Sequence, residues 1–428
     1  MFINKFFNNI SGHQISKFGI YGIGQAVNLI SPLLVLPYII SICGEEGLGK
    51  SGVGFSLALI AIVLVDYGSY INGTKDVSIN TTNKVVLEEI FLKVYLSKSI
   101  LLIVVLFFLS LFCLIIPFFR RDFIQFLLSF SIIVGQFVNP TWFLQGIQNF
   151  KWISIINVLS KVLYLLLIFI FIKQPQDYIY INLFYGLGLI FSSLIAFFWI
   201  RKKFSINLSN FSMVKAKELI KSEFSLTISQ LFFSFYQYSP IIIVGFLGGN
   251  QMAGQFKIID QIVMLFRTYF QVFFNFIYPD VCLRIFNNAK EGVSNWFLKN
   301  VLNYVLILFI IILFYWKSTD ILMYFNVENN SFKAIQGNFE IALLIPVFMG
   351  ISFALKQLVF AFSKNNVYIF ITIITTFLSL LLVGLLTSTF GLLGTFLTLI
   401  FTEIIVVTLY LIVLKDVFFL KIESNVEI

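Results

Sequence analysis

The chain has 428 residues, of which 59% are hydrophobic and 11% are charged, and its net charge is +9. Soluble domains carry about 25% charged residues, so this composition excludes a soluble globular enzyme, a disordered chain and a nucleic-acid-binding module. A polytopic membrane protein remains, with a mean hydropathy of +0.96. Three dispersed cysteines and one histidine also exclude a disulfide framework and a Cys- or His-based metal site, so no metal, cofactor or catalytic group is expected.

Twelve segments are apolar over the roughly 20 residues that a membrane-spanning helix needs. The sequence therefore predicts an all-α integral membrane protein, and its first residues are expected to be a retained cytoplasmic segment rather than a signal peptide. The spans are expected at residues 15–40, 52–73, 94–118, 123–144, 153–172, 178–200, 224–247, 256–279, 300–316, 339–361, 367–387 and 391–414.

The distribution of basic residues predicts the orientation of these spans. With a cytoplasmic N-terminus, 19 of the 29 Lys and Arg residues fall on the cytoplasmic side, Lys98 among them, 6 fall on the far side and 4 lie inside spans. Cytoplasmic loops of membrane proteins carry such an excess of positive charge. Both termini are therefore expected in the cytoplasm.

The longest polar connection, residues 201–223, divides the spans into two halves of six. We expect a six-helix bundle over 1–200, a basic amphipathic cytoplasmic linker over 201–223, a second six-helix bundle over 224–414 and a cytoplasmic tail over 415–428. The linker either lies among lipid headgroups or is a plain solvated connection. Both halves begin on the same side, so a duplication would be a parallel repeat about an axis along the membrane normal.

Each half has a Ser-Pro dipeptide in its first span and a glycine-rich loop after it, GEEGLGKSG from Gly44 and GGNQMAG from Gly248. This recurrence favours a duplication. The first loop also satisfies the nucleotide-binding pattern G-x-x-x-x-G-K-[ST], which requires a strand before the loop and a helix after it. Here the loop is expected to be a tight turn between two spans, so it does not predict a nucleotide site.

The eighth span carries the most informative polar pattern. At 100° per residue its polar side chains fall within about 120° of one another, and the other faces are apolar. Such a stripe either lines a water-accessible cavity or forms a polar network between packed helices. Its members are Lys257, Asp260, Gln261, Arg267, Thr268, Gln271 and Asn275.

Other spans contain fewer polar residues. Spans one and seven carry milder stripes, which serve either a cavity or hydrogen bonds between helices. Lys161 and Lys356 either face the interior or extend toward the cytoplasmic surface. Asp66 and Glu403 must be paired, protonated or in water, because an unpaired carboxylate inside a membrane is unfavourable.

Three stretches carry a family resemblance: VDYGSYINGTKDVSIN (65–80), PTWFLQGIQNFKWISIINVLSK (140–161) and YSPIIIVGFLGGNQMAGQFKIIDQI (238–262). In order and spacing the chain resembles the O-antigen and capsule repeat-unit flippases (Wzx-type). These form the polysaccharide transporter family within the multidrug/oligosaccharidyl-lipid/polysaccharide exporter (MOP) superfamily. The usual Tyr after the glycines of the third stretch is Phe256 here.

The resemblance implies two six-helix bundles that form a V around a polar cavity and open alternately to each side. The implied substrate is an undecaprenyl-diphosphate-linked oligosaccharide, moved to the periplasmic leaflet of the bacterial inner membrane. Membrane lipids are the implied surroundings, and the polymerase and chain-length regulator of the same pathway are implied partners. No nucleic acid is implied.

For such a substrate, Arg267 offers a fork suited to diphosphate oxygens, with Lys257, Lys161 and Lys356 as further cations. Asp66 or Asp260 could couple transport to an ion, although Asp260 could simply pair with Lys257. The amide side chains expected to bind sugar hydroxyls are Gln25, Asn28, Gln230, Gln237, Gln261, Gln271 and Asn275.

Two alternatives remain open. One is a small-molecule or drug antiporter on the same fold. The other is the membrane O-antigen polymerase, which would be expected to have a large loop on the far side for its chemistry. The largest far-side loop here, residues 317–338, contains no clustered Arg, His or paired acids.

Overall fold

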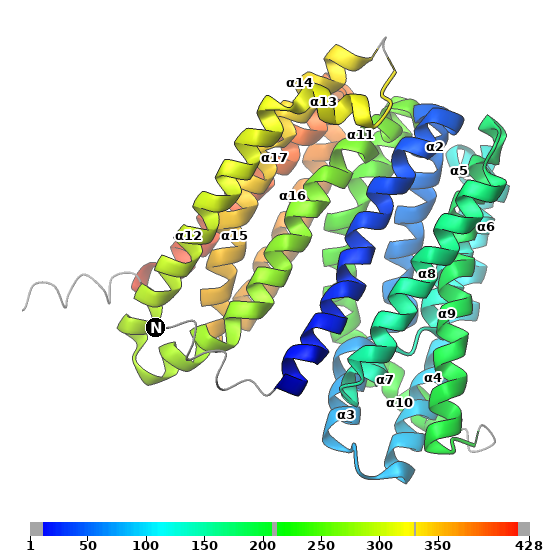
Figure 1. Ribbon diagram of the computed structural model, residues 1–428, viewed down its shortest axis with the longest axis vertical. Helices are drawn as coiled ribbons and strands as arrows, with labels where there is room; N and C mark the ends of the chain where they lie inside the picture. Colours follow the sequence, from blue (N-terminus) through cyan, green and yellow to red (C-terminus); the bar gives the residue numbers. More distant parts are fainter. Residues whose placement is uncertain (1–11, 208–211, 329–330, 418–428) are drawn as a thin grey trace, which may run out of the picture. The chain divides into compact units, whose positions relative to one another are not determined.

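The computed structural model describes residues 12–207, 212–328 and 331–417, and every regular element in these ranges is a helix (Figure 1). Ten of the described helical segments are long and apolar enough to cross a membrane. Large apolar side chains such as Ile103, Phe107 and Phe309 are exposed on them, as a hydrocarbon solvent permits. The predicted all-helical membrane protein is therefore confirmed.

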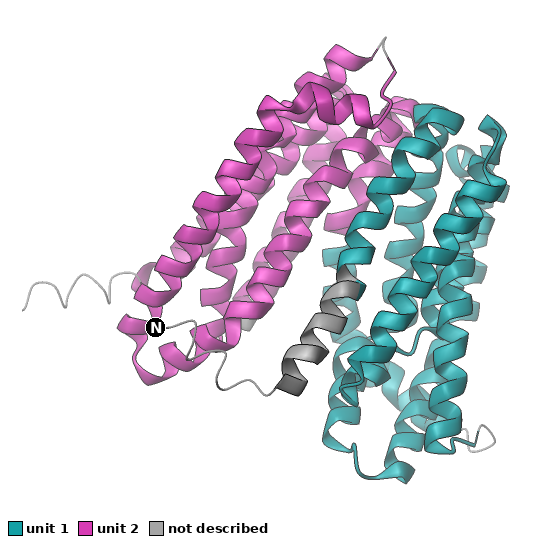
Figure 2. Cartoon of the chain, in the orientation of Figure 1, with its two compact units in different colours: residues 1–234 teal, residues 235–428 magenta. Residues whose placement is uncertain are grey.

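The chain forms two compact units, residues 1–234 and 235–428 (Figure 2). The first unit holds α2 (Gly12–Asp66), a π-helical turn η1 (Ser69–Gly73), α3 (Thr74–Ile79), α4 (Lys84–Ile115), α5 (Pro117–Arg121), α6 (Phe123–Val138), α7 (Thr141–Gly146), α8 (Phe150–Phe171), a 3₁₀ turn η2 (Pro175–Tyr180), α9 (Ile181–Phe204), α10 (Met213–Ser222) and the start of α11 (Phe224–Asn287). The second holds the rest of α11, then α12 (Ala289–Trp316), α13 (Ser318–Tyr324), α14 (Phe332–Ala342), α15 (Leu344–Ala361), α16 (Asn365–Phe390) and α17 (Leu392–Val413).

The two longest helices, α2 and α11, each contain one non-helical residue. In α2 it is Gly44, with φ 68° and ψ 177°, and in α11 it is Gly249, with φ 82° and ψ 174°. Glycine adopts positive φ without steric penalty. Each break divides its helix into two segments, and each segment has the length that a membrane-spanning helix needs.

The loop that matches the nucleotide-binding pattern is the break at Gly44. Its lysine, Lys50, lies 3.1 Å from a carboxylate oxygen of Glu46 and 3.3 Å from one of Asp122. Glu45 in the same loop is buried. A phosphate would therefore meet carboxylates here, in agreement with a structural turn.

Small residues let the helices of the first unit pack closely. A Cβ on Gly186 of α9 would lie 2.1 Å from the Ser131 hydroxyl of α6, and one on Gly188 would lie 2.4 Å from the Ser160 carbonyl of α8. Close backbone approach of this kind drives helix association inside membranes. An aromatic core that includes Phe91 then forms at the cytoplasmic end expected from the charge distribution.

The linker contains a helix that is docked on the first unit. Ala216 of α10 is fully buried, and its carbonyl accepts a hydrogen bond from the Ser97 hydroxyl of α4 at 3.1 Å. Lys215 pairs with Glu89 of α4 at 2.8 Å. The described part of the linker therefore packs on α4 as an ordered helix.

Candidate functional site

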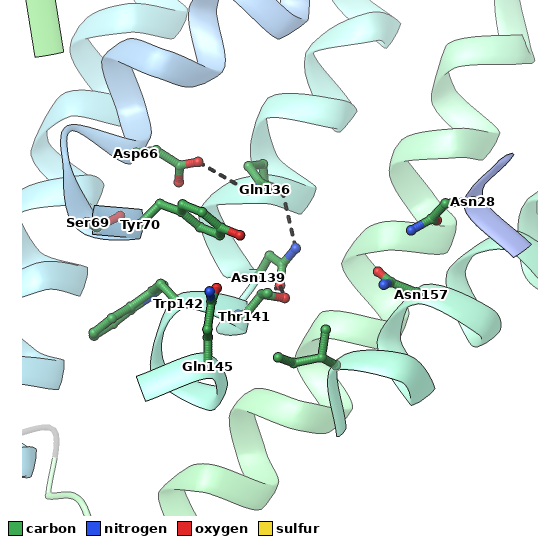
Figure 3. A pocket seen from close by; sticks show the side chains of 11 residues that line it. Asn28, Asp66, Ser69, Tyr70, Gln136, Asn139, Thr141, Trp142, Gln145 and Asn157 are labelled. Carbon is green, nitrogen blue, oxygen red and sulfur yellow. Dashed lines mark hydrogen bonds between the residues drawn. The ribbon is translucent and has the colours of Figure 1, made fainter. Parts of the chain in front are cut away.

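A polar pocket of about 150 Å³ lies inside the first unit (Figure 3). Its walls come from four places: α2, the turn after it, the α6–α7 junction and α8. The lining residues are Asn28, Asp66, Ser69, Tyr70, Gln136, Asn139, Thr141, Trp142, Gln145, Ile153 and Asn157. Most of them belong to the stretches 65–80 and 140–161, so the fold brings these two stretches together in one site.

A break at the end of α2 shapes one wall of this pocket. Tyr67 and Gly68 both have positive φ, 42° and 74°, and the chain then forms the π-helical turn η1. The carboxylate of Glu223 faces this break and accepts a hydrogen bond from the Asn72 side chain at 2.6 Å. The helix expected to run to residue 73 therefore ends at Asp66, which leaves Asp66 and Tyr70 at the pocket wall.

Asp66 is neutralised by a lysine of α4. The Lys98 ammonium lies 2.7 Å from one Asp66 carboxylate oxygen, and Gln136 donates a hydrogen bond to the other at 3.1 Å. Only 1% of Lys98 is exposed. The charge distribution places Lys98 among the cytoplasmic cations, and the structure shows that its side chain is buried inside the protein, because α4 packs against α2.

The remaining wall is held by amide hydrogen bonds. The side-chain amide of Asn139 donates a hydrogen bond to the side-chain oxygen of Gln136 at 3.3 Å. The side-chain oxygen of Asn139 accepts hydrogen bonds from the Thr141 backbone N–H at 3.0 Å and from the Thr141 hydroxyl at 2.6 Å. Asn139 thus secures the chain where α6 ends and α7 begins, and a continuous polar chain runs from Lys98 to Thr141.

The second unit presents the polar stripe of α11. Ile258, Ile259 and Phe266 on the opposite faces are buried in the unit, with exposures of 0%, 0% and 5%. The polar residues of the stripe are not buried by this packing. Those partly exposed are Lys257, Asp260, Gln261, Arg267 and Thr268, and those exposed are Gln271 and Asn275. A lipid-facing surface would be apolar, so this face is suited to water or to polar protein.

One buried carboxylate in this unit is held by hydrogen bonds from neighbouring helices. Glu403 of α17 is buried and accepts hydrogen bonds from the Tyr236 hydroxyl at 3.0 Å and the Ser352 hydroxyl at 2.8 Å. Among the described residues neither Arg267 nor Lys356 lies within ion-pair distance of this carboxylate, and their positive charges act on it from farther away. Both oxygens of the carboxylate are thereby hydrogen-bonded, as buried polar groups usually are.

Aromatic rings surround Lys356. Its ammonium lies 5.1 to 5.8 Å from four ring centroids, those of Phe274, Phe353, Phe360 and Tyr368. Ring faces attract cations, so they keep this lysine at the interior. Lys356 therefore does not simply extend to the membrane surface.

The other predicted residues are distributed over both units. Lys161 is buried in the first unit, with its ammonium 3.8 Å from the ring centroid of Tyr185. Gln237 and Arg267 both donate to the sulfur of Met264, at 3.9 and 3.3 Å. Gln230 is partly exposed in the first unit. The side chain of Gln25 lies outside the described residues.

Sequence reasoning missed most of the pocket of the first unit. Of its residues only Asn28 and Asp66 were predicted to be functional, while Gln136, Gln145 and Asn157 were not. The available signal was the pair of family-like stretches, whose polar residues could have been combined into one site. Within the described ranges no group of three or more His, Cys, Asp or Glu residues could hold a metal ion.

Solved structures share this fold. An inward-facing multidrug resistance MATE family transporter of the MOP superfamily has a TM-score of 0.71 at 14% identity, and the match covers 94% of this chain and 98% of that one. An outward-facing structure of such a transporter gives a TM-score of 0.59 at 14% identity over 95% of both chains. This likeness shows the fold alone, which is that of the MOP-superfamily transporters.

The sequence defines the family. Residues 15–279, more than half of the chain, match the family described as "Polysaccharide biosynthesis protein", and the chain belongs to this family. The family-level recognition is therefore confirmed, and the family and the fold agree with the expectation of a transporter rather than an enzyme.

Two relatives carry the name "Putative O-antigen transporter". The protein of Escherichia coli (strain K12) is 25% identical over 269 residues, which is 63% of this chain and 65% of that protein. The protein of Shigella dysenteriae is 24% identical over 246 residues, 56% of this chain and 60% of that protein. The match spans less than two thirds of either relative.

Proposed function

We propose that the protein is a flippase that moves polyprenyl-diphosphate-linked oligosaccharide repeat units from the cytoplasmic to the periplasmic leaflet of the bacterial inner membrane. The observation that carries this proposal is the polar face of α11, which the packing of its own unit leaves accessible. Family membership and the names of the two relatives support a polysaccharide precursor as the substrate.

The physical problem is the headgroup of such a substrate. Diphosphate charge and sugar hydroxyls have no partners in hydrocarbon, so an unaided crossing is prohibitive. A polar surface inside the protein replaces the lost hydration, while the lipid tail stays in the bilayer. The α11 face supplies both charged groups and amides over the depth of the membrane.

Arg267 is the proposed diphosphate ligand, because its planar fork matches phosphate oxygens. Lys257 of the same helix and Lys356 of α15 add positive charge. Lys161 would have to leave the Tyr185 ring to take part. Asp66 and Asp260 are the proposed ion-coupling residues. A coupling ion at Asp66 would have to compete with the Lys98 ammonium for the Asp66 carboxylate.

We further propose twelve spans in two halves of six, related by a parallel repeat, with both termini in the cytoplasm. The matching glycine breaks of α2 and α11 support the repeat. Residues 1–200 and 224–414 would be the two bundles that alternate access, 201–223 their linker and 415–428 the tail. The polymerase and chain-length regulator of the pathway would receive the flipped unit.

The deciding experiment is deletion of the gene in the source bacterium, followed by a gel of its surface glycolipid and of its lipid-linked intermediates. The proposal expects a lipid core without repeat units, accumulation of the lipid-linked unit and recovery with the cloned gene. An unchanged ladder together with increased drug susceptibility would contradict it and establish the antiporter instead.

A further inference from the structure

The pocket of the first unit is polar but has no uncompensated charge among its lining residues. Its one ionisable acid, Asp66, is paired with Lys98 and hydrogen-bonded by Gln136. Five of its eleven lining residues are Asn or Gln. This composition differs from that of α11 in the second unit, where Lys257 and Arg267 remain accessible.

The five amides fall into two groups. Gln136 and Asn139 are bonded within the wall. The side chains of Asn28, Gln145 and Asn157 have no hydrogen-bond partner in the described parts of the chain, although each is partly buried. Figure 3 shows Asn28 and Asn157 beside one another and Gln145 directed into the pocket from α7. Each carboxamide offers two N–H donors and a carbonyl acceptor, so the pocket retains unused capacity of both kinds.

Two further groups are available at the same place. The Ser69 hydroxyl is buried at the pocket wall and has no partner in the described structure. Half of Tyr70 is exposed, and Figure 3 shows its ring on the side of the pocket that carries Gln136, Asn139 and Gln145, with Asn28 and Asn157 on the other side. A flat ring beside unpaired amides provides an apolar surface next to donors and acceptors. A pyranose ring has the complementary pattern, with C–H groups on its face and hydroxyls on its edge.

We propose that this pocket binds an uncharged sugar residue of the translocated glycan, while the diphosphate binds in the second unit. The inference rests on the proposed function and assigns each unit a different part of the substrate. Asn28, Gln145 and Asn157 bond the hydroxyl or acetamido groups of the sugar, and Tyr70 packs on its ring. Such an amide-lined site rejects ligands that leave its polar groups unpaired.

The charge arrangement excludes acidic ligands from the pocket. Among the described lining residues there is no Lys or Arg, and Lys98 is already paired with Asp66 and buried. A phosphate or a uronic acid would therefore lose its hydration here without gaining a cation as partner, which is unfavourable. The pocket therefore selects neutral sugars.

The test is a binding measurement on the full-length protein in lipid nanodiscs by titration calorimetry. The probes are the repeat-unit oligosaccharide of the source bacterium, freed of lipid and diphosphate, and inorganic pyrophosphate. We expect the double variant Gln145→Ala/Asn157→Ala to weaken oligosaccharide binding at least tenfold and to leave pyrophosphate binding unchanged. Arg267→Ala should have the reverse effect. The control Asn366→Ala removes an exposed amide from α16 and should change neither.

Two results would overturn the inference: oligosaccharide binding that is absent from the wild type or unaltered by the double variant, or pyrophosphate binding that the double variant weakens. Either can occur while the cloned gene still restores surface glycan to the deletion strain, in which case the flippase proposal stands. Failure of the gene to restore glycan would contradict the flippase itself. Monodisperse elution and an unchanged helical circular dichroism spectrum show that each variant is folded.

Discussion

The pocket of the first unit and the α11 face of the second unit are both polar surfaces in a membrane protein, but they treat charge differently. In the pocket, Asp66 and Lys98 neutralise one another at 2.7 Å and leave neutral amides for binding. On α11, Arg267 and Lys257 are partly exposed. In the described part of the chain, the buried acid of the same unit, Glu403, is hydrogen-bonded by Tyr236 and Ser352 rather than ion-paired with Arg267. We therefore propose neutral ligands for the first surface and the diphosphate anion for the second.

The two surfaces also arise from opposite backbone features. The pocket depends on a helix that ends, because the break at Tyr67 and Gly68 places Asp66 and Tyr70 at its wall. The α11 face depends on a helix that continues, because only an unbroken helix keeps residues 257–275 aligned on one side. Variants that remove a charge or disturb the backbone should therefore act differently in the two units.

The largest expected effect is that of Arg267→Ala. Loss of the only Arg of the stripe should abolish surface glycan in the complemented deletion strain, because no other group of the stripe offers a bidentate phosphate contact. The readout is the glycolipid gel, with membrane levels of the protein checked by immunoblot. Arg284→Ala, on the same helix but paired with Asp280, is the control and should retain glycan. Full glycan in Arg267→Ala would refute the phosphate role.

The next largest effect should come from Lys98→Met. Removing the buried lysine leaves Asp66 without its counter-charge, which should lower the free energy of unfolding by about 3 kcal/mol. The loss of stability is measured by heating the protein in steps and following the monodisperse peak by size-exclusion chromatography. The double variant Lys98→Met/Asp66→Asn removes both charges and should recover most of the loss. If the double variant is no more stable than Lys98→Met, the pair does not act as a charge pair.

Gly68→Ala tests the helix break. An alanine would have to adopt φ 74°, and its Cβ would lie 2.6 Å from a Glu223 carboxylate oxygen. The strain of left-handed backbone alone is about 1–2 kcal/mol. We expect a lower melting temperature and weaker oligosaccharide binding. Gly337→Ala is the matched control, since its Cβ would meet no atom within 4 Å and the residue lies within the helix α14. Equal behaviour of the two variants would contradict a strained break.

The smallest effect is expected from Lys215→Ala. This lysine pairs with Glu89 at 2.8 Å, but 47% and 51% of the two side chains are exposed. Exposed pairs of this kind contribute about 0.5 kcal/mol or less. The melting temperature should therefore hardly change, in contrast to Lys98→Met in the same unit. A large loss of stability would mean that the pair holds α10 on α4 more firmly than its exposure indicates.

The alpha-helical membrane class and the α11 stripe could be predicted because both are local properties of the chain. Composition predicts whether a protein is surrounded by water or by lipid, because a chain with few charged residues cannot cover a water-facing surface. The periodicity of polar residues predicts which face of a helix is buried. In α11, Ile259 is buried and Lys257 is partly exposed, as predicted. The three motif stretches are also local features of the chain, and their order and spacing are enough to predict the family.

The partners of the polar groups depended on contacts between helices that no local pattern contains. Lys98 and Asp66 lie 32 positions apart on different helices, so no local pattern predicts that they form an ion pair. The rings around Lys356 come from three helices, and the amides of the pocket come from α2, α6, α7 and α8. A sequence pattern specifies which side of a helix is buried, whereas close packing of several helices selects the atoms it is buried against.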